Sequence, residues 1–172
     1  MQLRRRSLAD SRYFLTFCTA HRLPGLTDAR VAARLIAFVK ESDATGDTLT
    51  FAFTTMPDHV HWTLQLGERL ALGQVVAKFK SLTRPFLAAR TLGWQRNYYD
   101  HELRPDDSVE DYALYVFLNP YRAKLLPADQ SWAGWWSGAP VSLRFIAQLN
   151  ANGSPPPEWI VQPVPDGLAV GE

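Results

Sequence analysis

The segment from Met56 to Leu66 reads Met-Pro-Asp-His-Val-His-Trp-Thr-Leu-Gln-Leu. From His59 onward its polar and apolar residues alternate, which predicts a β-strand with one polar and one apolar face. His59 and His61 share the polar face, whereas Val60 and Trp62 share the apolar one. We expect the apolar face to pack on the core and the imidazoles to lie on an accessible face, where they can bind one divalent metal ion. The alternative is a solvated strand whose histidines have no special role.

Outward from this strand, hydrophobic periodicity predicts an α+β fold. Pro57 and Asp58 make a tight connection, so we expect the histidine strand to pair with the strand before it as an antiparallel hairpin. Apolar residues recur at helical spacing in two further segments. The expected elements are a strand at 13–19, a helix opening at 27–28 and ending before 46, a strand at 49–55, the histidine strand, a helix from 72 that Pro85 breaks or kinks, and a weaker strand at 97–100.

A short helix is expected to follow Ser108, which forms a capping box with Asp111 three residues later. Pro120 lacks an amide hydrogen and crowds the residue before it, so this helix is expected to end by Asn119. Tyr115 and Asn119 are four residues apart and share one face of the helix, with Asp111 one turn earlier. The pattern places three polar side chains along one stripe.

Tyr115 is the tyrosine of this helix that is best placed for chemistry. Tyr112 has Val116 at the equivalent offset and is expected to face the core, and Tyr121 lies beyond the expected end of the helix. The alternative for Tyr115 is an ordinary half-buried tyrosine whose hydroxyl binds water.

The composition is that of one globular domain. The chain has 172 residues, of which 47% are hydrophobic and 20% charged, enough for one well-packed core and too few for two. No apolar run approaches the roughly 20 residues that cross a bilayer. The basic N-terminus leads into no apolar signal segment. We therefore expect a cytoplasmic protein that does not associate with membranes.

Cysteine content and charge limit the kinds of site. Cys18 is the only cysteine, which excludes an intramolecular disulfide and a zinc site built on thiolates. A metal ion would be bound through histidine nitrogen and oxygen ligands. The net charge is +1, so a nucleic acid would have to be bound by local basic patches rather than by the overall field.

Three segments resemble the signature blocks of transposases associated with repetitive extragenic palindromic (REP) sequences. They are Thr55–His61, Trp94–Arg104 and Tyr115–Pro120, in the family's order. These REP-associated tyrosine transposases belong to the HUH single-tyrosine superfamily and are of the insertion-sequence-200-like type. The resemblance spans residues 13–126. It implies a ferredoxin-like or RRM-like antiparallel sheet with helices packed on one face.

The resemblance and the composition together predict a division of the chain. Residues 1–126 would form the HUH transposase-like catalytic domain. Residues 127–172, which are rich in Trp and Pro, would form an irregular C-terminal extension of the same domain that wraps the surface or is partly disordered.

Carried over to this sequence, the family's metal-binding histidines fall on His59 and His61 and its nucleophile on Tyr115. Asn119 stands where related enzymes offer an amide as a third metal ligand. The implied reaction is cleavage of single-stranded DNA through a 5′-phosphotyrosine, which a free 3′ hydroxyl can later attack to rejoin strands. The implied cofactor is Mg²⁺ or Mn²⁺, since imidazole ligands favour manganese and cellular abundance favours magnesium.

The implied partner is single-stranded DNA that folds into REP hairpins, bound by a monomer or a homodimer. Basic residues in several parts of the chain could follow a phosphate backbone, and an aromatic residue could stack on a base. The common alternatives are a solvated face for the basic residues and a core position for the aromatic one. The expected DNA-binding residues are Arg4, Arg5, Arg6, Lys78, Lys80, Arg84, Trp94, Arg96, Arg104 and Arg122.

Single residues argue against two other metal-dependent functions. A hydrolase with a His-x-His-x-His strand would need a third histidine where Thr63 stands. A two-histidine phosphoesterase would need the His-x-Thr pattern twice, and the chain has it once, at His61. A noncatalytic module that binds single-stranded DNA or RNA hairpins by stacking remains the alternative. Metal-dependent covalent trapping on DNA would separate it from a transposase.

Overall fold

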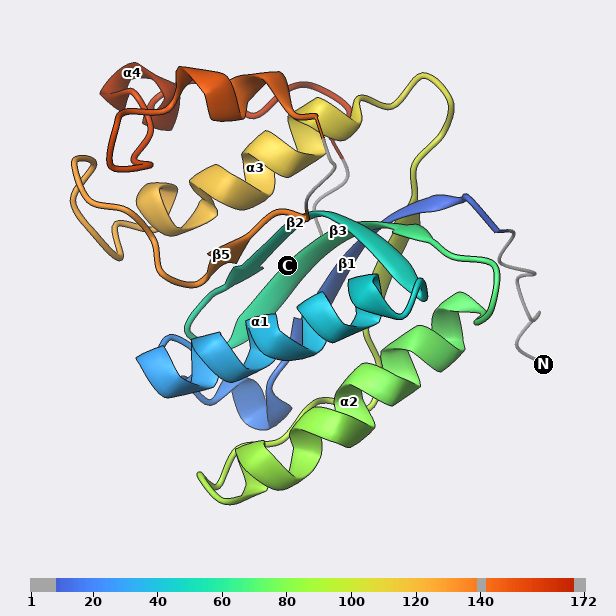
Figure 1. The fold of residues 1–172 in the computed structure, drawn as a ribbon. Coiled ribbons are helices and arrows are strands. Elements are labelled where there is room, and N and C mark those ends of the chain that lie inside the picture. The colour runs from blue at the N-terminus through green and yellow to red at the C-terminus, as the bar shows by residue number, and fades with distance from the viewer. Residues whose placement is uncertain (1–8, 139–141, 169–172) are drawn as a thin grey trace.

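The computed structural model describes residues 9–138 and 142–168. An antiparallel sheet in the order β4-β1-β3-β2-β5 lies between two helical layers (Figure 1). The strands are β1 (Arg12–Cys18), β2 (Thr48–Thr55), β3 (His59–Leu66), β4 (Tyr99–Glu102) and β5 (Trp135–Trp136). The helices are α1 (Ala29–Ala44), α2 (Leu72–Ala88), α3 (Val109–Arg122) and α4 (Pro157–Ile160), with 3₁₀ turns η1 (Ala20–Arg22) and η2 (Arg144–Gln148).

The expected α+β class and antiparallel sheet are confirmed. The histidine strand, β3, lies at the centre of the sheet between β1 and β2. It forms the expected hairpin with β2 around Pro57 and Asp58. The weaker strand, β4, begins two residues later than expected. Among the described residues, the helices lack the length or apolar character needed to cross a membrane.

One face of the sheet is covered by α1 and α2. Asp28 caps α1, because its carboxylate accepts hydrogen bonds from the amides of Arg30 and Val31. Trp62 of β3 is fully buried on this face, and its Nε1 donates to Thr50 Oγ1 at 2.9 Å. The apolar face of the histidine strand therefore packs on the core, as its alternation predicts.

α3 lies on the opposite face of the sheet (Figure 1). The expected arrangement with helices on one face thus describes α1 and α2 but not α3. The reason is that α3 buries residues around most of its circumference, between the sheet and the C-terminal segment. The expectation that β3 presents its histidines on an accessible face was wrong for His61, because α3 covers that part of the face, whereas His59 keeps 16% of its side chain exposed. His61 is 2% exposed and Thr63 is 0% exposed.

Both prolines that were expected to limit a helix lie inside one. α2 continues past Pro85 to Ala88, and α3 continues past Pro120 to Arg122. A proline in a helix leaves one carbonyl without its amide partner. In α3 the next residue, Tyr121, is 3% exposed and its hydroxyl donates to the Gln130 carbonyl at 2.9 Å. Packing of this last turn compensates for the lost hydrogen bond, so the expected helix end at residue 119 was wrong.

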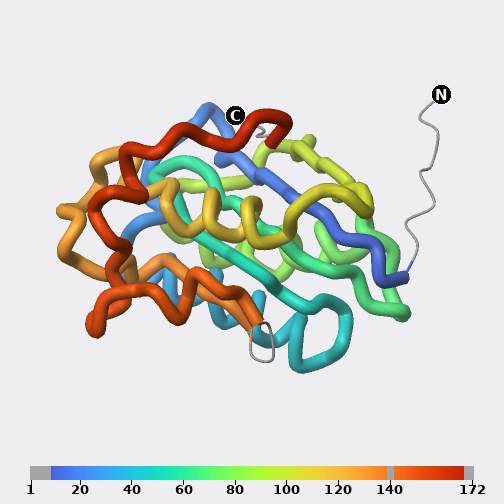
Figure 2. Tube along the Cα trace, turned by 90° about the horizontal axis from the view of Figure 1, so that it is seen from above, coloured from blue at the N-terminus to red at the C-terminus, as the bar shows by residue number. Residues whose placement is uncertain are grey.

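The chain after residue 126 extends the sheet and wraps α3 (Figure 2). Trp135 and Trp136 form β5, an edge strand paired with β2 that the sequence did not indicate. η2 and α4 pack on α3. Glu110 of α3 anchors this segment, because its carboxylate accepts hydrogen bonds from the amides of Arg144 and Phe145. A second cluster of buried apolar residues lies around α3, and the C-terminal segment completes it.

Candidate active site

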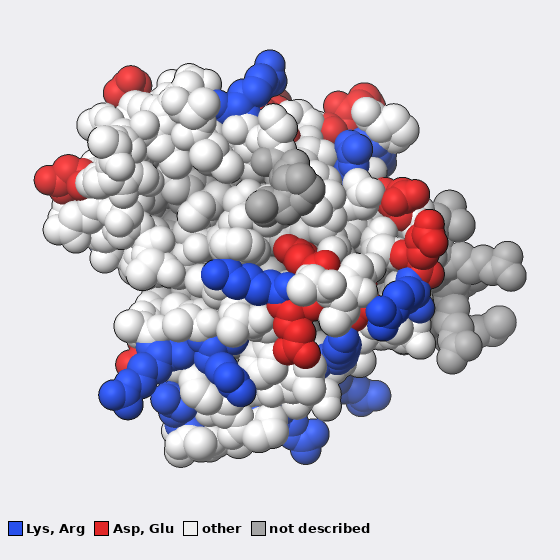
Figure 3. All heavy atoms as spheres, in the orientation of Figure 1, with Lys and Arg blue, Asp and Glu red and all other residues white. Residues whose placement is uncertain are grey.

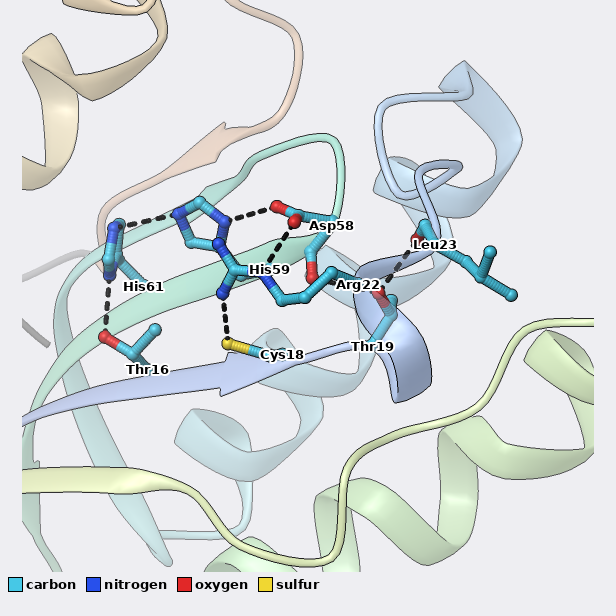
Figure 4. Close-up of polar contacts among 8 residues, drawn as sticks. All are labelled: Thr16, Cys18, Thr19, Arg22, Leu23, Asp58, His59 and His61. Atoms are coloured by element: carbon cyan, nitrogen blue, oxygen red, sulfur yellow. Dashed lines mark hydrogen bonds and ion pairs between the residues drawn. The ribbon is translucent and has the colours of Figure 1, made fainter. Parts of the chain in front are cut away.

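His59 and His61 bring their Nε2 atoms to 3.2 Å from each other (Figure 4). The second nitrogen of each ring, Nδ1, forms a hydrogen bond of its own. His59 Nδ1 lies 2.7 Å from Asp58 Oδ1, and His61 Nδ1 lies 2.9 Å from Thr16 Oγ1 on β1. The Asp58 carboxylate accepts, so His59 carries its proton on Nδ1 and keeps a lone pair on Nε2. The 3.2 Å contact is then a hydrogen bond from His61 Nε2 to His59 Nε2, and the Thr16 hydroxyl donates to His61 Nδ1. Because a hydroxyl can also accept, Thr16 equally suits the other tautomer of His61, which leaves Nε2 free for a metal ion.

This arrangement fits a shared divalent metal ion. Imidazole nitrogens bind such ions at about 2.0–2.1 Å, so two of them on one ion at a near-right angle lie about 3 Å apart. Asp58 and Thr16 supply the outer hydrogen bonds that orient metal-binding histidines. In residues 9–138 and 142–168 no three His, Cys, Asp or Glu side chains come together as a metal site. An ion here would be completed by amide, water or substrate oxygens.

The surroundings of His61 favour the uncharged imidazole. Burial, followed by the nearby charges of His59 and Arg22, lowers the pKa of His61 well below its usual value. The Phe14 ring stacks on His61, with 5.3 Å between ring centroids. The imidazole is therefore neutral at neutral pH, as a metal ligand must be.

Tyr115 reaches the histidine pair from α3. Its ring lies edge-on to His61 with 5.8 Å between centroids, and the residue is 8% exposed. Tyr112, three residues earlier, instead stacks on His101 of β4 with 5.7 Å between centroids. Asn119 lies one turn beyond Tyr115, is half-buried and shares its side of the helix. The structure thus brings a phenol to the histidine pair and an amide to the same helix face.

Arg22 joins the same network, and no motif in the sequence points to it. Its Nε lies 2.7 Å from Asp58 Oδ2, and its Nη1 donates to Cys18 Sγ at 2.7 Å (Figure 4). Asp58 therefore bridges Arg22 and His59, with one oxygen for each. His21 and Arg22 both have left-handed backbones, with φ of 57° and 56°. Such conformations cost non-glycine residues roughly 1–3 kcal/mol each and often occur at functional sites.

Residues 7–110 match the family model described as IS200-like transposase. The match covers more than half of the chain. The chain belongs to this family. The matched residues of the transposase include His59 and His61 and end before Tyr115 and Asn119. No curated protein matches this chain.

Two solved structures resemble this transposase. One, described as a REP-associated tyrosine transposase bound to a REP hairpin, has a TM-score of 0.59 and 17% identity over 73% of this chain and 76% of that chain. The other, a candidate transposase from Deinococcus radiodurans, has a TM-score of 0.41 and 18% identity over 73% of this chain and 92% of that chain. The first likeness supports the fold.

Three of the residues predicted to bind DNA are engaged inside this transposase. Lys78 Nζ lies 2.7 Å from the buried carboxylate of Asp47. Lys80 Nζ donates to the carbonyls of residues 95–97, and burial lowers the pKa of Lys80. Trp94 packs against the core beneath α1 and α2. α2, which carries both lysines, lies on the face of the sheet opposite the histidine pair.

The other predicted DNA-binding residues differ in exposure. Arg84, Arg96 and Arg104 are exposed. Arg122 donates through Nη2 to the Gln162 carbonyl at 3.3 Å, while its Nε and Nη1 are buried with no partner in the described part of the chain. On the face drawn in Figure 3, Lys and Arg side chains gather mainly over the α1 and α2 layer. Outside the described residues lie Arg4, Arg5 and Arg6.

Proposed function

We propose that this chain nicks single-stranded DNA and transfers strands, with Tyr115 as the nucleophile. The observation that carries the proposal is the position of Tyr115 against His61, whose Nε2 converges with that of His59. A phenol that can form a phosphate ester is thus next to two nitrogens that can hold a divalent ion. A phosphate bound at this contact between α3 and β3 would meet both groups.

In the proposed reaction, the Tyr115 oxygen bonds to phosphorus while the bond from phosphorus to the 3′ oxygen breaks. The phenol proton passes to solvent, and the departing 3′ oxygen takes up a proton to become a hydroxyl. The 5′ phosphate remains on Tyr115 as an ester. Because this step exchanges one phosphate ester for another, a 3′ hydroxyl of a second strand can reverse it without a nucleotide cofactor.

For the cofactor, we propose Mg²⁺ or Mn²⁺ bound by His59 and His61, with Asn119 as a further ligand. The ion would supply Lewis-acid polarisation of the phosphate. This role of the two histidines is supported by the hydrogen bonds of Asp58 and Thr16 to their Nδ1 atoms, which fix the direction of both imidazoles. Asn119 is supported by its place one turn from Tyr115 on the same side of α3.

For the substrate, we propose single-stranded DNA beside a short palindromic hairpin, the ligand class named for the solved transposase of similar fold. Exposed cations are the best candidates for phosphate contacts. Lys78, Lys80, Trp94 and Arg122 already have partners or packing within the protein. The exposed or N-terminal candidates are Arg96, Arg104, Arg4, Arg5 and Arg6. Arg84 is also exposed but lies on α2, on the other face of the sheet.

Covalent trapping tests this function. The chain is incubated with single-stranded DNA that covers the hairpins of its own genomic neighbourhood, with Mg²⁺ or Mn²⁺, and separated on a denaturing gel. We expect a protein–DNA adduct and a nicked strand, both dependent on the ion. Tyr115→Phe should give neither, whereas the matched control Tyr112→Phe should give both. DNA binding with no adduct under any ion would instead favour a noncatalytic hairpin-binding module.

A further inference from the structure

The guanidinium of Arg22 is fixed on two sides next to the histidine pair (Figure 4). Its Nε pairs with Asp58 and its Nη1 donates to Cys18, each at 2.7 Å. The third nitrogen, Nη2, has no partner within the described residues, and the side chain is 45% exposed. Because Asp58 also binds His59, the cation and the imidazole are tied to one carboxylate. An accessible donor is thereby held beside the proposed metal ligands.

The backbone around Arg22 is shaped to keep it there. His21 and Arg22 adopt consecutive left-handed conformations in η1, directly after β1. Thr19 Oγ1 lies 2.8 Å from the Leu23 carbonyl and 3.1 Å from the Asp58 carbonyl, so its single hydroxyl hydrogen is shared between the two sides of this turn. The Thr19 amide donates to the same Asp58 carbonyl at 2.8 Å. A strained turn held in place by several hydrogen bonds is typical of a functional position.

We propose that Arg22 is a phosphate-binding residue of this site, whose Nη2 donates to a nonbridging oxygen of the DNA phosphate bound at His59 and His61. The proposal rests on the function proposed above and adds a residue that no sequence motif indicates. Guanidinium N–H groups form strong, charge-assisted hydrogen bonds with phosphate oxygens. A fixed cation there would also stabilise the negative charge that builds on the phosphate during attack.

Electrostatics supports this placement. Asp58 accepts from Arg22 Nε with one oxygen and contacts His59 Nδ1 with the other, so the guanidinium charge lies one carboxylate away from the histidine pair. Asp58 and Cys18 occupy Nε and Nη1, so orienting Asp58 makes no use of Nη2. The unused donor is the part of Arg22 that a substrate can reach.

The test is the salt dependence of DNA binding. Binding of an oligothymidylate of about 20 nucleotides is measured by fluorescence anisotropy in EDTA, across a range of salt concentrations. Each phosphate neutralised on a single strand adds about 0.7 to the slope of log affinity against log salt. We expect Arg22→Gln to lower this slope by about 0.7 and to weaken binding roughly tenfold at low salt. Arg22→Lys should keep the slope, because the charge remains.

The matched control is Arg34→Gln, which removes an exposed arginine from α1 on the other side of the sheet and should change nothing. If Arg22 only orients Asp58, Arg22→Gln will bind with an unchanged slope, and that result would overturn the proposal. Equal slopes for the Gln and Lys variants of Arg22 would also contradict it. Because no cleavage takes place in EDTA, the outcome is independent of whether the chain nicks DNA.

A second measurement uses the unmodified protein, and a variant is needed only to assign the Arg22 resonance. The Nε–Hε resonance of Arg22 is followed by NMR in the unmodified protein as oligothymidylate is added. We expect this resonance to shift with the same affinity that anisotropy gives. Saturation of the protein with oligothymidylate without any shift would contradict the proposal.

Discussion

The ring of Tyr115 lies edge-on to the ring of His61, with 5.8 Å between their centroids. Phe14 of β1 packs against both rings, with its ring centroid 5.3 Å from that of His61 and 6.1 Å from that of Tyr115. One aromatic side chain of the sheet therefore positions the proposed nucleophile of α3 relative to the proposed metal ligand of β3.

Removal of one imidazole should stop cleavage and spare DNA binding. His59→Ala leaves His61 as the sole imidazole of the pair, so we expect nicking to fall by roughly two orders of magnitude or more. EDTA should act in the same way on the unmodified protein. Hairpin affinity, measured by anisotropy, should change little, because phosphate contacts remain. Full cleavage in EDTA would show that the pair is not a catalytic metal site.

Asp58→Asn should weaken metal binding without removing a ligand. The carboxylate keeps the His59 proton on Nδ1, whereas an amide can donate to Nδ1 and so favour the tautomer that cannot bind metal through Nε2. We expect Mn²⁺ affinity, measured by titration, to fall roughly 10- to 100-fold. Asp106→Asn, at an exposed loop position, is the control. Equal affinities of the two variants would refute this role of Asp58.

Substrate form should decide cleavage. Tyr115 on a helix and His61 on a covered sheet must both reach one phosphate, and a paired, stiff duplex offers poor access to that geometry. We expect cleavage of a hairpin with a single-stranded flank, little cleavage of an unstructured strand and essentially none of the fully paired sequence. An equimolar comparison of the three on a denaturing gel measures this. Equal cleavage of the duplex would rule out the single-strand mechanism.

Asp47 should make stability depend on acid pH. Burial raises the pKa of this carboxyl, but hydrogen bonds from Lys78 and Thr45 and the charges of Lys78 and Arg69 outweigh it, so the pKa lies below its usual value. A carboxyl with a lowered folded-state pKa stabilises the fold above its unfolded pKa, and this contribution is lost as pH falls through the folded value. We therefore expect the free energy of unfolding to drop below about pH 4.

Urea unfolding at a series of pH values measures this loss. Asp47→Asn removes the titrating group, so the variant should be less stable near neutral pH and should lose less stability on acidification. Asp106→Asn again serves as the exposed control. Identical pH profiles for Asp47→Asn and the unmodified protein would contradict the prediction.

The elements that sequence predicts well are those set by local chemistry. The alternation from His59 to Leu66 gives the strand its bounds and the direction of its side chains, since both follow from the period of two. Asp28 and Ser108 cap α1 and α3 as expected, because a cap involves only neighbouring amides. Proline is a local signal too, but at Pro120 the burial of Tyr121 outweighs it.

The features that sequence does not predict depend on distant contacts. Nothing in the histidine strand says which element lies above its polar face, so the burial of His61 beneath α3 emerges only in three dimensions. Arg22 owes its place to an unusual backbone and to Asp58, which arrives from another loop. The sequence does not indicate that Lys78 pairs with Asp47, because the two residues meet only in the folded chain.

Mass spectrometry of the covalent adduct tests the central claim most directly. The chain is trapped on hairpin DNA with a single-stranded flank in the presence of Mn²⁺, then digested with nuclease and protease, and the modified peptide is sequenced. We expect a 5′-phosphotyrosine linkage on Tyr115, with no nucleotide on Tyr112 or Tyr121. An adduct on another residue, or cleaved DNA that ends in a free 5′ phosphate with no protein attached, would contradict the assignment of Tyr115 as the nucleophile.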